Sequence, residues 1–157
     1  MRFTSERETL SEDLIFDLDL FPYMNCIVCI PNCFYYYRMN PNSLSHSFSM
    51  EKYLRTHIFF RVIQDRLSRL YDENEFRLHY QRLMFLYLRN SIYNSLHTQE
   101  TLAVKFRNVK KILYDELWCE LLALYPYKRM ELSHRIYFFV LQHRWTLLTM
   151  ITNRLFI

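Results

Sequence analysis

The sequence predicts an α+β fold that is mostly α, with a short helix, two short strands and then a bundle of about four helices. Apolar residues recur at helical spacing over residues 14–21, and two β-prone runs flank a Pro-Asn turn at residues 31–32. From residue 50 onward the apolar spacing is helical. We therefore expect two parts, residues 1–49 and a helical domain over residues 50–157.

The first helix is expected to begin at Ser11. The Ser11 hydroxyl is suited to accept a backbone N–H of the first turn, and Glu12 and Asp13 follow where the helix dipole favours negative charge. Pro22 ends the helix. The helix dipole alone explains an acidic pair at this position, unless the neighbouring segments give the pair a further role.

Two short strands are expected next, a buried one over residues 25–30 and a second over residues 33–38. Cys26, Cys29 and Cys33 lie in these strands, and positions three apart in a strand face opposite sides of a sheet. The cysteines are therefore expected to be small buried hydrophobes and not metal ligands.

The remainder of the chain predicts four helices with short connections near residues 72–74, 96–99 and 126–130, so that neighbouring helices are antiparallel. Each helix carries one apolar stripe that is expected to face the core. In chain order the stripes are Phe59, Val62, Ile63, Leu67 and Leu70; Phe76, Tyr80, Leu83, Met84, Tyr87 and Leu88; Leu102, Phe106, Val109, Leu113, Leu117, Leu121 and Leu124; and Leu132, Ile136, Phe139, Val140, Leu147 and Ile151.

The composition excludes some nucleotide-binding sites. Glycine is absent, whereas average usage would give about 11 glycines in a chain of this length. A P-loop or a dinucleotide-binding fingerprint needs glycines to bring the backbone against phosphate, so neither exists here. Residues 1–49 carry three Arg against six acids, and residues 50–157 carry seventeen Lys and Arg against ten acids. The basic residues are spread singly, which favours solvent-exposed faces over a nucleic-acid site.

The first ten residues are polar, and no apolar stretch reaches the length of a membrane span. We therefore expect a cytoplasmic protein with reduced cysteines. The last helix nevertheless combines five basic residues with aromatic ones, so peripheral contact with the inner face of the cell membrane is an alternative to packing in the core. These residues are Lys128, Arg129, Arg135, Arg144 and Arg154 beside Phe138, Phe139, Trp145 and Phe156.

Three features of the first third occur in a recognisable order. An acidic pair opens a helix, a short strand follows, and the sequence FYYYRMNPNSLS occupies residues 34–45. Together these features resemble the C-terminal end of the catalytic domain of bacterial family-2 glycosyltransferases, which have the GT-A fold and use nucleotide-sugar donors. The resemblance covers residues 11–47, and the helical remainder is similar only in general terms to the variable tails of such enzymes.

The resemblance implies roles for four residues. Asp13 would be the catalytic base, which takes the proton from the acceptor hydroxyl as that hydroxyl attacks the anomeric carbon, and Glu12 would lie beside the acceptor. The loop over residues 38–47 would close over the nucleotide diphosphate, with Arg38 and His46 binding the substrate. The alternatives are a salt bridge for Arg38 and an ordinary polar loop position for His46.

The family's donor-binding half, with its Asp-x-Asp metal motif, would precede Ser11, where this sequence has ten residues. Asp17-Leu18-Asp19 lies inside a helix, so we expect no metal on this chain and a divalent cation, Mn²⁺ or Mg²⁺, only in the complete enzyme. The sequence thus predicts the acceptor-side part of a glycosyltransferase that acts on a cell-surface glycan or a lipid-linked acceptor and is inactive without its donor half. The alternative is a non-catalytic helical module that binds a partner protein.

Overall fold

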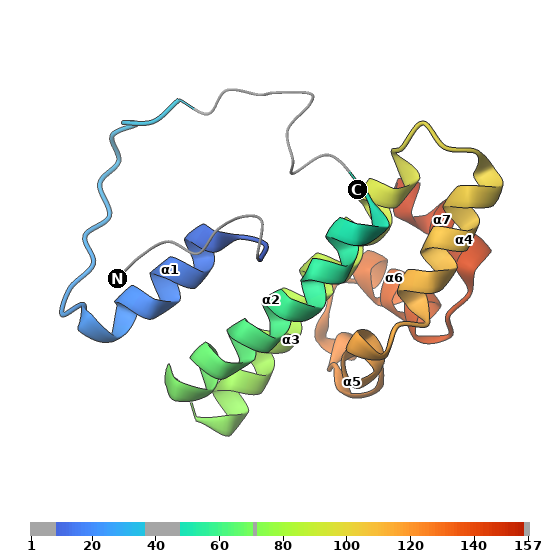
Figure 1. Ribbon diagram of the computed structural model, residues 1–157. Helices are drawn as coiled ribbons and strands as arrows, with labels where there is room; N and C mark the ends of the chain where they lie inside the picture. Colours follow the sequence, from blue (N-terminus) through green and yellow to red (C-terminus); the bar gives the residue numbers. More distant parts are fainter. Residues whose placement is uncertain (1–8, 37–47, 71, 156–157) are drawn as a thin grey trace.

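The computed structural model describes residues 9–36, 48–70 and 72–155, and these residues form seven α-helices and no strand (Figure 1). The fold is therefore mostly α, as predicted. Short 3₁₀ turns follow α1 and precede α5 and α6. The helices are α1 (Glu12–Leu20), α2 (Met50–Leu70), α3 (Glu73–Leu96), α4 (Leu102–Leu113), α5 (Cys119–Leu124), α6 (Leu132–Gln142) and α7 (Thr146–Leu155).

Helices α2 and α3 form a long antiparallel hairpin and lie side by side along their length (Figure 1). Aromatic side chains fill the space between them. The ring of Phe59 stacks on Tyr87 with centroids 4.7 Å apart, and Phe60 meets Tyr80 edge to face at 5.7 Å. Phe59 and Leu88 are fully buried, which confirms the predicted core stripes of these two helices.

Helices α4 to α7 form a cluster beside this hairpin, at the right in Figure 1, and α4, α5 and α7 pack against α3. Trp118, just before α5, is fully buried and contacts Phe60 edge to face at 5.6 Å. Phe138 of α6 is also fully buried, with its ring 5.5 Å from that of Phe85 on α3. One hydrophobic core therefore joins the hairpin to the C-terminal helices.

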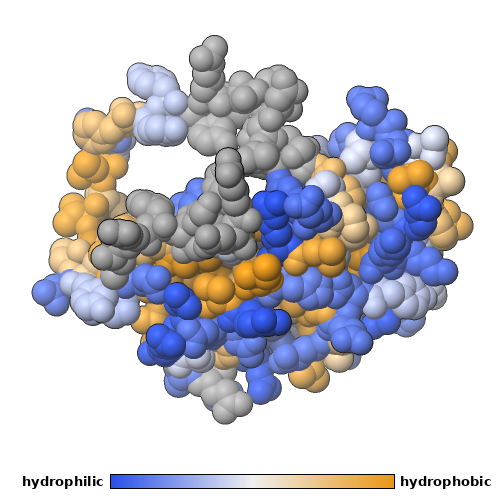
Figure 2. Space-filling view, viewed as in Figure 1, coloured by the Kyte–Doolittle hydropathy of each residue, from blue (hydrophilic) through white to orange (hydrophobic). Residues whose placement is uncertain are grey.

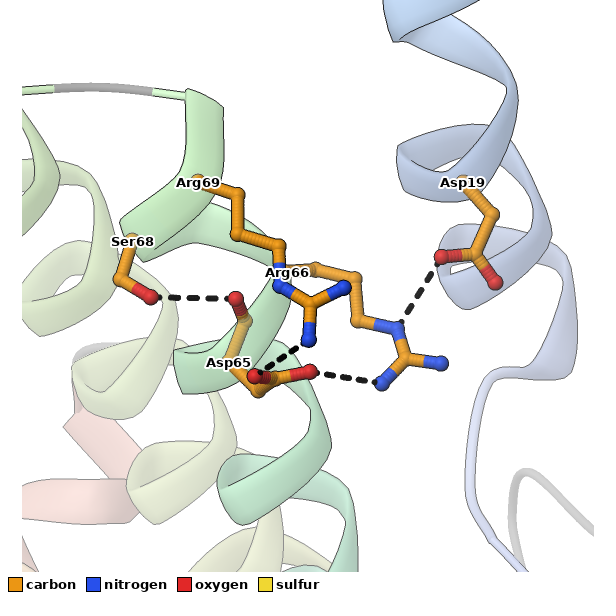
Figure 3. Close-up of polar contacts among 5 residues, drawn as sticks. All are labelled: Asp19, Asp65, Arg66, Ser68 and Arg69. Carbon is orange, nitrogen blue, oxygen red and sulfur yellow. Dashed lines mark hydrogen bonds and ion pairs between the residues drawn. The ribbon is translucent and has the colours of Figure 1, made fainter.

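Helix α1 packs on α2 through Ile15 and Leu18, which belong to the same core. Beside this contact, Arg66 of α2 bridges the two helices (Figure 3). Its Nε donates to Oδ1 of Asp19 at 3.0 Å, and its Nη1 donates to Oδ2 of Asp65 at 3.1 Å. The division of the chain at residue 49 stays a prediction, although α1 shares the core of the helical part.

The expected strand over residues 25–30 is not formed, and this prediction is wrong. Residues 24–36 have no regular structure apart from bends and are exposed throughout, including Cys26, Cys29 and Cys33. The segment stands away from the helices at the left of Figure 1, where Figure 2 shows a hydrophobic edge. A β-prone run becomes a strand only beside another strand, and the described residues offer none.

The third predicted helix, over residues 102–124, is broken between Leu113 and Glu116. Asp115 causes the break, because its Oδ1 accepts the N–H of Leu117 at 2.9 Å and so begins a new 3₁₀ turn. The apolar spacing continues across the break, so the pattern of residues alone did not indicate it. Cys119, which follows the turn, is also exposed.

The fourth predicted helix, over residues 132–151, is also broken, at His143–Trp145. The N–H of Arg144 bonds to Leu141 O at 2.9 Å, and the N–H of Trp145 bonds to Val140 O at 3.3 Å. Arg144 has a left-handed backbone (φ 54°). These are the bonds of a Schellman motif, which commonly ends helices at glycine. Because the chain has no glycine, the usual sequence signal for this helix end was missing.

The predicted core stripe of this last region is mostly on the outside. Only Val140 of its six members is buried, whereas Leu132 and Leu147 are 68% and 65% exposed. The core side of α6 is formed instead by Tyr137, Phe138 and Leu141. Because residues 136–141 are apolar almost continuously, the helix has two apolar faces, and periodicity cannot tell which of them is inward.

Candidate functional site

Ser11 attaches the start of α1 to α3 in place of capping the helix. Its backbone is left-handed (φ 49°, ψ 57°), and its side chain makes no cap hydrogen bond. A capping serine has an extended backbone that directs its oxygen at the first turn, and Ser11 lacks that geometry. Its hydroxyl hydrogen-bonds instead to the hydroxyl of Tyr87. The predicted cap is therefore wrong, and the residue holds two helices together.

Asp13 presents its carboxylate to solvent at the first turn of α1. Oδ1 of Asp13 accepts the N–H of Leu14 at 2.8 Å, which fixes the carboxylate at the positive end of the helix. The charge of Asp13 also affects the pKa of the Tyr87 hydroxyl. Burial raises the pKa of Tyr87, its hydrogen bond with Ser11 opposes that rise, and the Asp13 charge adds to it. Asp13 is thus an exposed residue whose carboxyl group is held by its hydrogen bond to Leu14.

Glu12 lies in the wall of a pocket of about 410 Å³. The pocket is lined by residues 9–12, by Phe48 and Ser49, by five residues in the first half of α2, and by Tyr87, Asn90, Ser91 and Asn94 of α3. A volume of this size lies within the range of small-molecule sites, about 300–1,000 Å³. Asp13 is not among the lining residues and is exposed to solvent. The structure therefore places one acid of the pair in the pocket wall and the other outside it.

Both hydrogen-bond donors and hydrogen-bond acceptors line this pocket. Glu51 and Arg55 contribute charges of opposite sign and form an ion pair of 2.9 Å on α2. Asn90 and Asn94 contribute amides from α3, and Tyr87 adds an aromatic ring. A lining that contains amide, carboxylate and guanidinium groups is suitable for a polyhydroxylated ligand, because each hydroxyl needs both donors and acceptors.

A second polar cluster begins at Tyr53, which also lines the pocket. Its hydroxyl donates to Oδ2 of Asp115 at 2.8 Å, and His57 Nε2 lies 2.9 Å from the same oxygen. Burial, followed by the hydrogen bond to Asp115, raises the pKa of Tyr53, so its hydroxyl stays protonated as a donor. The Asp115 carboxylate thus orients both an imidazole and a phenol. Sequence reasoning missed this cluster because its members are far apart in the chain.

Other lining residues were also missed, although a signal for them existed. Asn90, Ser91 and Asn94 interrupt the apolar pattern of α3 with polar groups at helical spacing. Such an interruption indicates a site on that face of the helix. The two predicted substrate-binding residues, Arg38 and His46, lie outside the described residues.

Within the described ranges, no cluster of three or more His, Cys, Asp or Glu side chains is arranged to hold a metal ion. Asp19 of the Asp17-Leu18-Asp19 sequence is paired with Arg66, and Asp17 is exposed. No helix among the described residues has the length and apolar character needed to cross a membrane.

Comparison of the chain with protein-family models, with curated proteins and with solved structures found no match. A proposal of function therefore rests on the residues of this chain.

Proposed function

We propose that this chain supplies the acceptor side of a nucleotide-sugar-dependent glycosyltransferase, with Asp13 as the catalytic base and Glu12 beside the acceptor. The observation that carries the proposal is the position of the acidic pair. The Asp13 carboxylate is exposed and fixed at the start of α1, and Glu12, the residue before it, lines a pocket that contains several hydrogen-bonding side chains. An acceptor glycan held by Glu12 in this pocket would have a hydroxyl within reach of Asp13.

The proposed reaction is an inverting transfer. Asp13 takes the proton from an acceptor hydroxyl, whose oxygen forms a bond to the anomeric carbon of the donor sugar. The bond from that carbon to the phosphate oxygen breaks, and the nucleoside diphosphate leaves with the electron pair. Arg38 and His46 would contact the donor diphosphate from the loop that contains them.

The exposed segment over residues 24–36 supports a separate donor-binding half. Val28, Phe34 and Tyr36 of this segment are 77%, 77% and 91% exposed. A β-prone segment with exposed apolar side chains is suited to pair with the edge strand of a sheet, which would cover those side chains. In the proposed enzyme, a donor-binding sheet outside the described residues covers this segment. That half would also hold the divalent cation that balances the charge of the donor phosphates.

The first experiment reads the genomic DNA upstream of the codon for Met1. An in-frame segment that encodes an Asp-x-Asp motif would supply the donor-binding half, which is then expressed joined to this chain. Release of nucleoside diphosphate is measured with a panel of nucleotide-sugars and Mn²⁺. We expect the joined protein to turn over and the isolated chain to be inactive.

Asp13 is tested in the joined protein. Asp13→Asn should lower kcat by about 10²-fold or more, because a positioned base contributes about 10²–10⁴-fold. Asp17→Asn, an exposed acid on the same helix, is the matched control and should leave kcat unchanged. Turnover by the isolated chain, or full activity of Asp13→Asn, would contradict the proposal.

A second candidate function is a non-catalytic helical module that binds a partner protein. The observation that favours it is the number of large apolar side chains that α6 and α7 leave exposed. Size-exclusion chromatography with light scattering, followed by a pull-down, separates the two functions. A monomer that captures no partner argues against the interaction module.

A further inference from the structure

Helix α7 is packed with its polar side inward. Thr149 and Asn153, one turn apart, are 0% and 2% exposed, whereas Leu147 and Ile151, also one turn apart, are 65% and 57% exposed. An amphipathic helix on a core normally buries its apolar stripe, because each buried apolar side chain is favourable by about 1.5–3 kcal/mol. The outward apolar stripe of α7 is therefore suited to contact an apolar environment other than the core.

Helix α6 adds a second outward apolar stripe. Its inward side holds Tyr137 and Phe138, which are 1% and 0% exposed. On its outward side, Leu132, Ile136 and Phe139 follow one another at spacings of four and three and are 68%, 46% and 40% exposed. The core of the protein thus accounts for only one of the two apolar faces of this helix.

Trp145 joins the two stripes into one surface. Its ring lies 5.9 Å from that of Phe139 on α6, and its main-chain oxygen accepts the N–H of Thr149 at 2.8 Å, so it starts the first turn of α7. Leu148 follows three positions later on the same side of α7. We define the α6–α7 surface by its exposed apolar residues, which are Leu132, Ile136, Phe139, Trp145, Leu147, Leu148 and Ile151.

Positively charged side chains lie on and just before the α6 part of the α6–α7 surface. Arg135 is exposed and lies on the outward side of α6, between Leu132 and Phe139. Lys128 and Arg129 are exposed in the turn just before α6. From residue 126 to residue 157 the sequence has five Lys and Arg residues and one acid, Glu131. The surface therefore combines apolar side chains, a tryptophan and a cationic border.

We propose that the α6–α7 surface binds the surface of an anionic lipid bilayer, with both helices lying in the plane of the interface. Outward apolar residues would enter the boundary between headgroups and acyl chains, and Trp145 would sit at headgroup level. Arg135, Lys128 and Arg129 would pair with lipid phosphates. The helices are already folded on the core, so binding orders no new segment.

The positive charge of the α6–α7 surface favours an anionic bilayer over a second copy of the chain as its binding partner. Two copies that met through this surface would bring two borders of the same positive sign together, which opposes association. An anionic bilayer has the complementary sign and accepts the apolar stripe without a shaped pocket. The proposal does not depend on glycosyl transfer, and its test needs no turnover.

Co-sedimentation of the full chain with lipid vesicles tests the proposal. At low salt we expect binding to vesicles of phosphatidylcholine with one third phosphatidylglycerol, and no binding to pure phosphatidylcholine. Raising the salt concentration should release the protein, because exposed charges are screened. Brominated lipids should quench Trp145 and not the buried Trp118, and Trp145→Phe should remove this quenching.

The decisive variant is Leu147→Gln with Ile151→Gln, which should weaken vesicle binding about tenfold or more. Its matched control is Leu54→Gln with Ile58→Gln, because these residues have the same spacing on α2 and are 55% and 49% exposed. The control should bind as the natural chain does. Circular dichroism checks that both variants keep their helix content.

Charge is tested in the same way. Arg135→Gln should weaken binding to the anionic vesicles, and Arg61→Gln, which changes an exposed arginine on α2, should not.

Equal loss of binding in both double variants would overturn the proposal, as would failure of the natural chain to sediment. A dimer in light scattering that Leu147→Gln with Ile151→Gln converts to a monomer would assign the surface to a second copy instead.

Discussion

The hydroxyl of Tyr53 donates a hydrogen bond of 2.8 Å to Oδ2 of Asp115, across 62 positions of the sequence. The same hydroxyl accepts a hydrogen bond of 2.9 Å from Nε1 of the fully buried Trp118. His57 Nε2 also lies 2.9 Å from the Asp115 oxygen. The Asp115 carboxylate therefore joins α2 to the turn after α4. This is the turn that divides the helix predicted over residues 102–124.

Replacing Tyr53 with Phe should destabilise the fold by about 1–3 kcal/mol. The ring would still pack, but Nε1 of Trp118 would lose its acceptor inside the core. Urea unfolding at neutral pH, followed by circular dichroism, measures the change. Tyr36→Phe is the control, because Tyr36 is 91% exposed, and it should change the free energy of unfolding very little. Equal stability of the two variants would contradict the role of the Tyr53 hydroxyl.

The protein should lose stability at alkaline pH through its buried tyrosines. Burial, with a smaller effect of the Glu120 charge, raises the pKa of Tyr80 to about 12, and burial also raises the pKa of Tyr53, Tyr87 and Tyr137. In the unfolded chain a tyrosine titrates near pH 10. The unfolded chain therefore releases protons first, so the stabilisation is complete below pH 10 and is lost as the pH rises toward 12 and above.

Urea unfolding at several pH values between 9 and 12 measures this loss. Each tyrosine that stays protonated in the folded state contributes a slope of about 1.4 kcal/mol per pH unit. Tyr80→Phe should lower the total slope by about that amount near pH 11. Tyr36→Phe should leave the slope unchanged. An unchanged slope in Tyr80→Phe would show that Tyr80 titrates normally in the folded protein.

The sequence predicted the helices whose apolar residues occupy one face. In the second half of α2 the stripe that includes Phe59 and Ile63 is buried, because Arg61 and Gln64 on the other side left only one face there suited to the core. Helix α6 is apolar on both faces, so the same reasoning selected the outward stripe that contains Ile136. Periodicity identifies an apolar face, and it identifies the core only when there is one such face.

The candidate site was predicted in part for a similar reason. Residues close in sequence, such as Glu12 and Asp13, could be recognised as an acidic pair at a helix start. Asn90 of the pocket wall and the pair of His57 with Asp115 come from distant parts of the chain. Tertiary packing brings these side chains together, and no local pattern encodes that packing.

Arg66 should control how firmly α1 is held on α2. Its contact with Asp19 is partly exposed, so the ion pair contributes about 0–1 kcal/mol. We expect Arg66→Gln to change global stability little and to speed proteolysis of α1 at low salt. The control is Arg69→Gln, because the ion pair of Arg69 with Asp65 lies within α2. Equal proteolysis rates for the two variants would show that Ile15 and Leu18 hold α1 without this bridge.

At position 144 a glycine variant should be more stable than an alanine variant, which is the reverse of the usual order within a helix. The backbone of Arg144 is left-handed at the end of α6, a conformation that costs a residue with a Cβ about 1–2 kcal/mol. Its guanidinium also donates to Sγ of Cys119 at 3.4 Å and lies 5.1 Å from the centre of the Tyr114 ring.

Both Arg144→Ala and Arg144→Gly remove these side-chain contacts, but only the glycine variant relieves the backbone. We therefore expect Arg144→Gly to be about 1 kcal/mol more stable than Arg144→Ala in thermal unfolding. Ala103 in the exposed first turn of α4 supplies the control, since Ala103→Gly should destabilise in the ordinary direction. If Arg144→Ala proved the more stable of the two, the helix would not end at Arg144 in a left-handed turn.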